Sequence, residues 1–143
     1  MWPEWINLLR LSADAGLVVL IWIVQGIIYP SFRYFSSDVL QEWHHRYTRW
    51  IGGIVMPLML IQLGLILSQF WWVKNGYTIS SLILLILVWL STFIQFVPRH
   101  QKIANNQATK ALLNQLVKLN WIRTIIWTAM FIITLTYLLA FAK

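Results

Sequence analysis

The segment EWINLLRLSADAGLVVLIWIVQGIIY, residues 4–29, decides the fold class. It is an apolar run with few polar interruptions, and it exceeds the roughly 20 residues that a helix needs to cross a bilayer. Pro3 suits the first position of a helix and Pro30 follows the run, so a helix signal stands at each boundary. The run is too long for the apolar core of a signal peptide, and no small-residue cleavage motif follows it. We therefore expect a retained membrane helix.

Three further apolar runs follow, and the composition of the chain agrees with them. Of 143 residues, 59% are hydrophobic and 10% are charged, whereas about a quarter of the residues in soluble domains are charged. Pro57 falls inside the second run, and membrane helices tolerate proline where neighbours satisfy the freed backbone. We predict an all-α integral membrane four-helix bundle that forms a single domain over residues 1–143. The predicted helices cover residues 4–29, 49–70, 79–97 and 109–141.

Positive charge is distributed unevenly between the predicted loops. The net charge is +7, and most Lys and Arg residues lie in or beside the two long segments 30–48 and 98–118. The opposite side carries only Arg10, Lys74 and Lys143. Because cytoplasmic loops are enriched in Lys and Arg, we predict a multi-pass protein of the bacterial inner (plasma) membrane, with both termini outside and the two long loops in the cytoplasm. Topology explains the charge, so nucleic acid is not an expected partner.

The two halves of the chain share a faint pattern. Each half has Trp, Gln and Pro towards the end of its first helix, then histidine, then a Trp-Ile pair at its second helix. The pattern predicts two parallel helical hairpins with a shared site between them. Coincidence of interfacial Trp and helix-ending Pro explains the same letters, so both interpretations stay open. The matching residues are Trp22, Gln25, Pro30, His44, His45 and Trp50 in the first half, and Trp89, Gln95, Pro98, His100 and Trp121 in the second.

Two opposite charges lie inside the first predicted helix. Arg10 and Asp14 are four residues apart, so they share a helical face and are placed to form an ion pair near the middle of the bilayer. Gln62 on the second helix falls at a similar depth, within hydrogen-bonding range of them. Polar side chains in a membrane are unfavourable unless they pair or face the bundle interior. We predict an intramembrane pair, and a structural role, protonation of Asp14 and a role in proton transfer or ligand binding stay open.

The other polar residues converge towards the cytoplasmic ends of the helices. Arg123 lies one turn inside the fourth helix, and Asn120 and Trp127 share its face, a composition typical of a clamp for a carbonyl or anionic group. Snorkelling of Arg123 to the interface is the alternative, and hydrogen bonds between helices explain most Gln, Ser and Thr residues. The predicted ligand-binding residues are Gln25, Tyr29, Gln95, Asn120, Arg123 and Trp127.

The three histidines, His44, His45 and His100, lie in or beside the predicted cytoplasmic loops. Histidine exchanges protons near neutral pH, so His45 and His100 are the predicted catalytic residues. Solvated loop histidines without a functional role are an alternative that stays open. A metal site with Asp38 or Glu42 is an alternative, but no pair of ligands has the spacing that one helical face requires, and we predict no metal ligands. Haem would favour a histidine within a span, and none is present there, so the identity of any cofactor stays open. The lack of cysteine excludes thiolate chemistry.

Four blocks of the sequence carry a family resemblance: IWIVQGIIYPSF (21–32), WHHRYTRWIGGIVMP (43–57), WLSTFIQFVPRHQKIA (89–104) and LNWIRTIIWTA (119–129). They resemble those of a family of small four-helix bacterial membrane proteins, whose build is similar to that of the anthrone-oxygenase-like membrane proteins. The family has no settled activity, and the resemblance implies a shared site that adds His45 and His100 to the ligand-binding residues named above. A second resemblance, to the small membrane protoporphyrinogen oxidases, lies in YPSFRYF and RYTRWIGGIVMP. Those enzymes place a histidine in the first helix, where this chain has Ser12 and Asp14.

Two functions fit the sequence. The first is a membrane protein that binds a hydrophobic, partly polar ligand or cofactor at the cytoplasmic His/Arg/Gln/Asn cluster, with oxidoreductase chemistry as its enzymatic form. The second is a non-enzymatic membrane subunit or an assembly or lipid-binding protein. The expected partners are the lipid bilayer, a hydrophobic small molecule and a second copy of the chain. Whether the protein is an enzyme stays open.

Overall fold

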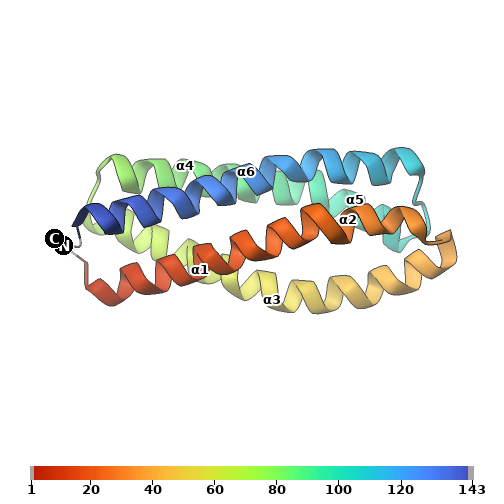
Figure 1. Ribbon diagram of the computed structural model, residues 1–143, viewed down its shortest axis with the longest axis horizontal. Coiled ribbons are helices and arrows are strands. Elements are labelled where there is room, and N and C mark those ends of the chain that lie inside the picture. Colours follow the sequence, from red (N-terminus) through yellow and green to blue (C-terminus); the bar gives the residue numbers. More distant parts are fainter. Residues whose placement is uncertain (1, 142–143) are drawn as a thin grey trace.

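The computed structural model describes residues 2–141, and within that range the regular structure is entirely helical. The helical segments join into four long rods (Figure 1). Two rods are built from several segments, because their backbone changes from α-helix to π-helix part-way along. The first rod comprises α1 (Glu4–Ile23), the π-helix η1 (Val24–Ile28), α2 (Tyr29–Ser31) and the 3-10 helix η2 (Phe32–Tyr34). The others are α3 (Ser37–Trp72), then α4 (Gly76–Leu90) with the π-helix η3 (Ser91–Phe96) and α5 (Val97–Ala104), and finally α6 (Lys110–Phe141).

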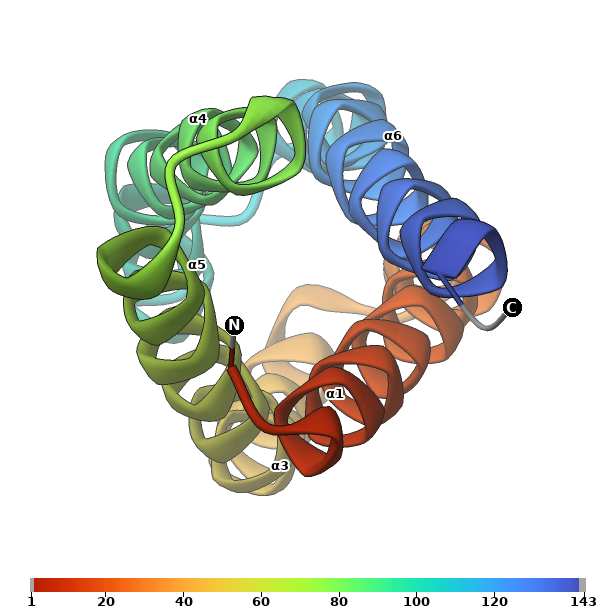
Figure 2. The ribbon, with the colours of Figure 1, turned by 90° about the vertical axis from the view of Figure 1, so that its left-hand side faces the viewer.

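The four rods form an antiparallel bundle. Viewed end on, they occupy the corners of a square around a shared interior (Figure 2). The α1 rod packs between α3 and α6, and α4 also packs between α3 and α6. The start of α1 and the end of α6 lie at the same end of the bundle, and the segments joining α2 to α3 and α5 to α6 lie at the other (Figure 1). The predicted four-helix bundle is confirmed.

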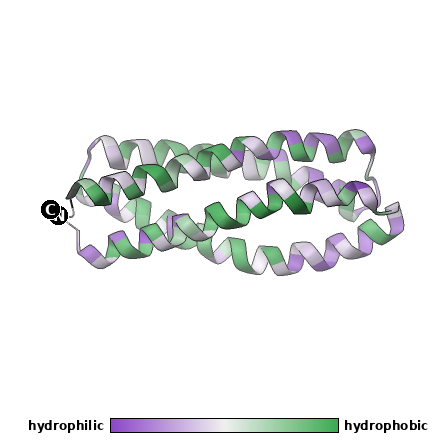
Figure 3. Ribbon diagram, in the orientation of Figure 1, coloured by the Kyte–Doolittle hydropathy of each residue, from purple (hydrophilic) through white to green (hydrophobic). Residues whose placement is uncertain are grey.

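Each rod is long and apolar enough to cross a membrane. Large apolar side chains are exposed along the outer faces, where a soluble protein would place polar residues. Exposed hydroxyl groups of Ser12, Ser68 and Thr136 donate to carbonyl oxygens of their own helices, so they present no free donor to lipid. Apolar residues dominate the middle of the bundle, and polar residues gather at the end away from the termini (Figure 3). The chain therefore has the character of a multi-pass membrane protein.

The second rod extends well beyond the predicted residues 49–70. The α3 helix has 36 residues, which span about 54 Å, whereas the hydrocarbon core of a bilayer is about 30 Å thick. Its first turns continue because Leu40, His44 and Tyr47, spaced at helical intervals, are buried in the bundle. Hydropathy marks where a helix leaves lipid, and this helix continues past that point. His44 and His45 accordingly lie on a helix and not in a loop.

The sequence predicted that Pro30 and Pro98 end their helices, and this prediction is wrong, because both rods continue past these prolines. Each proline occupies the first turn of a new α-helical segment, α2 or α5, where its missing N–H is tolerated. Each segment directly follows a π-helix, η1 or η3. A π-helix accommodates one extra residue within a helix and occurs often at functional sites. His100 is therefore placed on α5, one turn beyond η3.

Candidate functional site

Two polar clusters lie inside the bundle. The first, named here the ion-pair network, contains Arg10 and Asp14 and lies in the half nearer the termini. The second, named here the histidine cluster, lies in the other half and consists of Tyr29, His44, His100, Asn120 and Arg123. All of these side chains are buried except that of His100, which is half-buried.

The ion-pair network is centred on Arg10 and Asp14, which are four residues apart on α1. Arg10 Nε lies 2.9 Å from Asp14 Oδ2, and both side chains are fully buried. The Arg10 guanidinium also donates to Gln69 on α3 at 3.2 Å and to Ser81 on α4 at 3.3 Å. The ion pair predicted from the helical spacing is thus present, and it joins three rods.

Asp14 extends the network to the fourth rod. Its carboxylate accepts hydrogen bonds from Gln62 on α3 and, at 2.6 Å, from the hydroxyl of Thr134 on α6. Gln62 in turn accepts from the indole N–H of Trp127 at 3.3 Å. A buried charge is tolerated when paired and hydrogen-bonded, and this carboxylate meets both conditions. The network is therefore a closed structural unit that also holds Trp127.

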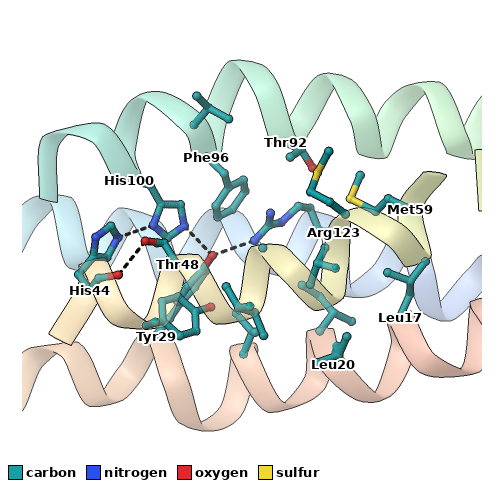
Figure 4. A pocket seen from close by; sticks show the side chains of 18 of the residues that line it. Leu17, Leu20, Tyr29, His44, Thr48, Met59, Thr92, Phe96, His100 and Arg123 are labelled. Carbon is teal, nitrogen blue, oxygen red and sulfur yellow. Dashed lines mark hydrogen bonds between the residues drawn. The ribbon is translucent and has the colours of Figure 1, made fainter. Parts of the chain in front are cut away.

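Four side chains of the histidine cluster, each from a different segment, form a chain of contacts (Figure 4). His44 Nε2 on α3 lies 2.7 Å from His100 Nδ1 on α5. The hydroxyl of Tyr29, on α2, lies 2.9 Å from His100 Nε2. Arg123 Nη2 on α6 donates to the same hydroxyl at 3.0 Å. The contacts run without a break from His44 to Arg123.

Local helical spacing and the π-helix η1 hold Arg123 in place. Arg123 Nε donates to Asn120 Oδ1 at 3.0 Å, across three residues of α6. Asn120 Nδ2 donates at 2.9 Å to Gln25 in η1, and Gln25 donates to the carbonyl of Val117 at 3.3 Å. On the other side, the guanidinium lies 3.4 Å from the ring centroid of Phe96, a cation–π contact. The guanidinium is fixed on two sides.

The positive charge of Arg123 has no counter-charge. Its side chain is 8% exposed, and the ion pair between Arg10 and Asp14 is the only one within residues 2–141. Its Nη1 makes no hydrogen bond to any side chain or carbonyl of the described chain. Removing a charge from water is costly unless a partner compensates it. This position favours an anion or a carbonyl oxygen.

A pocket of about 420 Å³ adjoins the histidine cluster. Its polar end is lined by Tyr29, His44, His100 and Arg123, whereas apolar side chains of α1, α3 and η3 line most of its wall. Among the lining residues, Met56 on α3 and Val97 on α5 are 41% and 37% exposed. The pocket therefore opens on the flank of the bundle between these two helices. The apolar wall includes Leu17, Leu20, Ile21, Val24, Ile51, Val55, Met59, Phe96 and Trp127.

Most of the residues predicted from sequence come together at this pocket, but two do not. His45 is exposed on α3, because one residue along a helix turns the side chain by about 100°. Gln95 accepts a hydrogen bond from Ser91 and lies on the side of η3 away from the pocket. His44 takes the position that the sequence had assigned to His45. Of the other predicted residues, Tyr29, His100, Arg123 and Trp127 line the pocket, whereas Asn120 and Gln25 do not line it and join it through the hydrogen bond of Asn120 with Arg123.

A signal for His44 was present in the sequence. Leu40, His44 and Tyr47 have the spacing of one buried helical face, whereas His45 falls outside it. This spacing is visible only if the second helix is taken to begin before residue 49, in a stretch where the hydropathy of the sequence is low. Within residues 2–141, no three His, Cys, Asp or Glu side chains come close enough to hold a metal ion.

Comparisons with protein-family models, with curated proteins and with solved structures find no match to this chain. The resemblances drawn from short sequence blocks stay predictions. The function is therefore argued from the geometry of the site.

Proposed function

We propose that this multi-pass membrane protein binds an amphipathic small molecule in the pocket beside the histidine cluster. The proposal rests on one observation. Arg123 is buried, its positive charge has no counter-charge, and it lies at the polar end of a pocket whose remaining wall is mostly apolar. A ligand with a carbonyl or anionic head would supply the missing partner of the guanidinium, and its apolar body would fill the rest. The volume of about 420 Å³ lies within the range of small-molecule sites.

The proposed ligand enters from the lipid. The exposed lining residues Met56 and Val97 lie on the flank of the bundle, among side chains suited to contact acyl chains. By the distribution of Lys and Arg, we place the histidine cluster on the cytoplasmic side of the bacterial inner membrane, with both termini outside. A molecule dissolved in the bilayer would reach the pocket without crossing water.

Ligand extraction is the direct test of binding. The protein is purified in mild detergent, and the bound small molecules are extracted and identified by mass spectrometry, with an absorption spectrum of the intact sample. We expect an amphipathic molecule with an acidic or carbonyl head. A ligand-free preparation from every lipid tried would contradict the proposal.

Two adjacent glycines provide a matched pair of variants. Gly52 lines the pocket, whereas Gly53 does not, and an added Cβ meets no atom within 4 Å at either position. Gly52→Leu should fill part of the pocket and lower the amount of ligand per protein at least tenfold. Gly53→Leu should retain it. Both substitutions improve helix propensity by a similar amount, so a difference between them reports on the pocket and not on folding.

If the protein is an enzyme, we propose that it carries out oxidoreductase chemistry on the bound ligand. Tyr29 and His100 stand next to the head-group position, where exchange of protons with a reacting ligand would be needed. A coloured preparation whose spectrum changes on addition of a reductant would support this form. A colourless preparation with a bound, redox-inactive lipid would restrict the function to binding.

Assembly through polar faces is the alternative function. The polar stripes of the four rods meet one another inside a single chain, and this leaves few polar groups for a partner. Arg123→Ala and His100→Ala distinguish the two functions by crosslinking in membranes. An assembly role predicts that complexes are lost, whereas ligand binding predicts unchanged crosslinks and lost ligand.

A further inference from the structure

The contact between the imidazoles of His44 and His100 restricts where the protons of the two rings lie. Their 2.7 Å contact joins one nitrogen of each ring, so one of those two nitrogens carries a proton and the other accepts it. A neutral pair holds two protons on four ring nitrogens. The second proton therefore sits on one of the two outer nitrogens, His100 Nε2 or His44 Nδ1, and the other outer nitrogen is vacant.

The two outer nitrogens have different surroundings. His100 Nε2 contacts the hydroxyl of Tyr29, whereas His44 Nδ1 is buried and has no hydrogen-bond partner within the described residues. His44 itself is 1% exposed. A buried nitrogen with no partner is unusual in a folded protein and calls for an explanation. The vacancy moves from one outer nitrogen to the other only when the bridging proton crosses between the rings while one outer nitrogen gains a proton and the other loses one.

We propose that the pocket binds an acidic hydroxyl compound, a phenol or a carboxylic acid with an apolar body, and that the His44–His100 pair takes its proton. This inference rests on the proposed function. The O–H bond of the ligand breaks heterolytically, and its proton passes through the Tyr29 hydroxyl to the imidazole pair. The anion left behind pairs with the Arg123 guanidinium. No electron is transferred, and no other reactant is needed.

The charged groups around the His44–His100 pair support the coupling of proton uptake by the pair to ionisation of the ligand. The ionisable groups that surround it are Tyr29 on α2, His45 and Tyr47 on α3, and Arg123 on α6. No carboxylate within residues 2–141 forms an ion pair with either histidine. A positive charge on the pair is disfavoured first by burial of the two rings, and Arg123 adds repulsion while the pocket lacks an anion. A bound anion removes that repulsion, so proton uptake and ligand ionisation occur together.

A chromophoric phenol tests the proposal. An octyl-substituted nitrophenol is suitable, because its phenol and phenolate forms have distinct absorption spectra. At a pH about 1 to 3 units below the ionisation midpoint of the probe in protein-free micelles of the same detergent, we expect the probe to take the phenolate spectrum when it binds, because the guanidinium stabilises the anion. Binding itself is verified by displacement in Gly52→Leu and retention in Gly53→Leu.

The proton balance identifies the acceptor. In weakly buffered solution, wild type should release almost no protons as phenolate forms, because the pair retains them. His100→Gln should release about one proton per phenolate, since Arg123 alone then stabilises the anion. His44→Leu should release an intermediate amount, because His100 still contacts Tyr29 but has no second imidazole to share the charge. His45→Gln, whose side chain is exposed on the next residue of α3, should behave like wild type. His100→Gln keeps a hydrogen-bonding group towards Tyr29, which limits the loss of folding.

The outcomes separate this inference from the proposed function. A bound probe whose phenolate forms with release of about one proton in wild type would overturn the inference and leave ligand binding intact. Equal effects of His44→Leu and His45→Gln would also overturn it. Failure of the probe to bind, with no difference between Gly52→Leu and Gly53→Leu, would instead contradict the proposed function.

Discussion

At the scale of single residues, the two buried arginines have opposite circumstances. Arg10 forms an ion pair with Asp14 and donates hydrogen bonds to neutral acceptors, so its charge is balanced within the bundle. Arg123 has amide and hydroxyl acceptors and an aromatic ring, but no anion. Arginine is therefore paired within the fold in one half of the bundle, whereas in the other half its charge lacks a counter-ion, and we propose that a ligand supplies it.

Asp14→Leu should strongly destabilise the protein. It leaves the Arg10 charge buried without a partner, which costs about 3–5 kcal/mol in comparable cases. Thermal unfolding in detergent should show a much lower midpoint than wild type. Ser12→Ala, at an exposed position two residues away, is the control and should leave the midpoint almost unchanged.

Removing both charges should be less harmful than removing one. In the double variant Arg10→Met with Asp14→Leu, no unpaired charge remains in the bundle. Its unfolding midpoint should lie between those of Asp14→Leu and wild type. A double variant less stable than Asp14→Leu would mean that the hydrogen bonds of the network, and not the unpaired charge, dominate the cost.

At the scale of elements, the two π-helices set which side chains face the pocket. The η1 segment presents Gln25 to Asn120, and η3 presents Phe96 to Arg123. A π-helix contains one residue more than the α-helix that would replace it. The helices on either side therefore keep their buried faces while the residues between them are shifted.

Deletion of one residue should be tolerated in η3 and not in α4. Ile94 in η3 is 66% exposed and Ile83 in α4 is 53% exposed, so the two deletions remove similar side chains. Deleting Ile94 lets η3 become α-helical without rotating its neighbours. Deleting Ile83 turns Leu85 and Val88 about 100° away from the core.

Thermal unfolding and the yield of monodisperse protein measure this difference. The Ile94 deletion should unfold near the midpoint of the Ile94→Ala substitution, whereas the Ile83 deletion should unfold far below Ile83→Ala. Similar losses for both deletions would show that η3 does not absorb a change of one residue.

At the scale of the whole molecule, sidedness decides which compartment the histidine cluster faces. The connections at residues 35–36 and 105–109 lie at one end of the bundle, and the start of α1 and the end of α6 lie at the other (Figure 1). Lys143 lies outside the described residues. From the distribution of positive charge, we propose that the end with these two connections faces the cytoplasm.

Single cysteines test this orientation, because the chain contains none of its own. Ser36→Cys and Gln107→Cys lie in the two connections at the histidine end, and Lys74→Cys lies in the turn at the other end. A membrane-impermeant thiol reagent applied from outside should label Lys74→Cys only. Inside-out vesicles should give the reverse pattern, and labelling of Ser36→Cys from outside would invert the proposed topology.

Features that depend on neighbouring residues were predictable from sequence. The four apolar spans follow from local composition, and the contacts of Arg10 with Asp14 and of Arg123 with Asn120 follow from spacings of four and three residues on one helix. These interactions need no knowledge of how the helices pack. They determine the class of fold and the positions of the buried charges.

The tertiary structure decided which histidines meet and where the pocket lies. His44 and His100 are 56 residues apart, and their contact depends on how far each helix is rotated about its axis. The π-helices η1 and η3 and the extension of α3 before residue 49 set those rotations. Hydropathy reports where a helix contacts lipid, but not how far the helix is rotated about its axis. Sequence alone therefore named His45 as a site residue, whereas packing brings His44 into contact with His100.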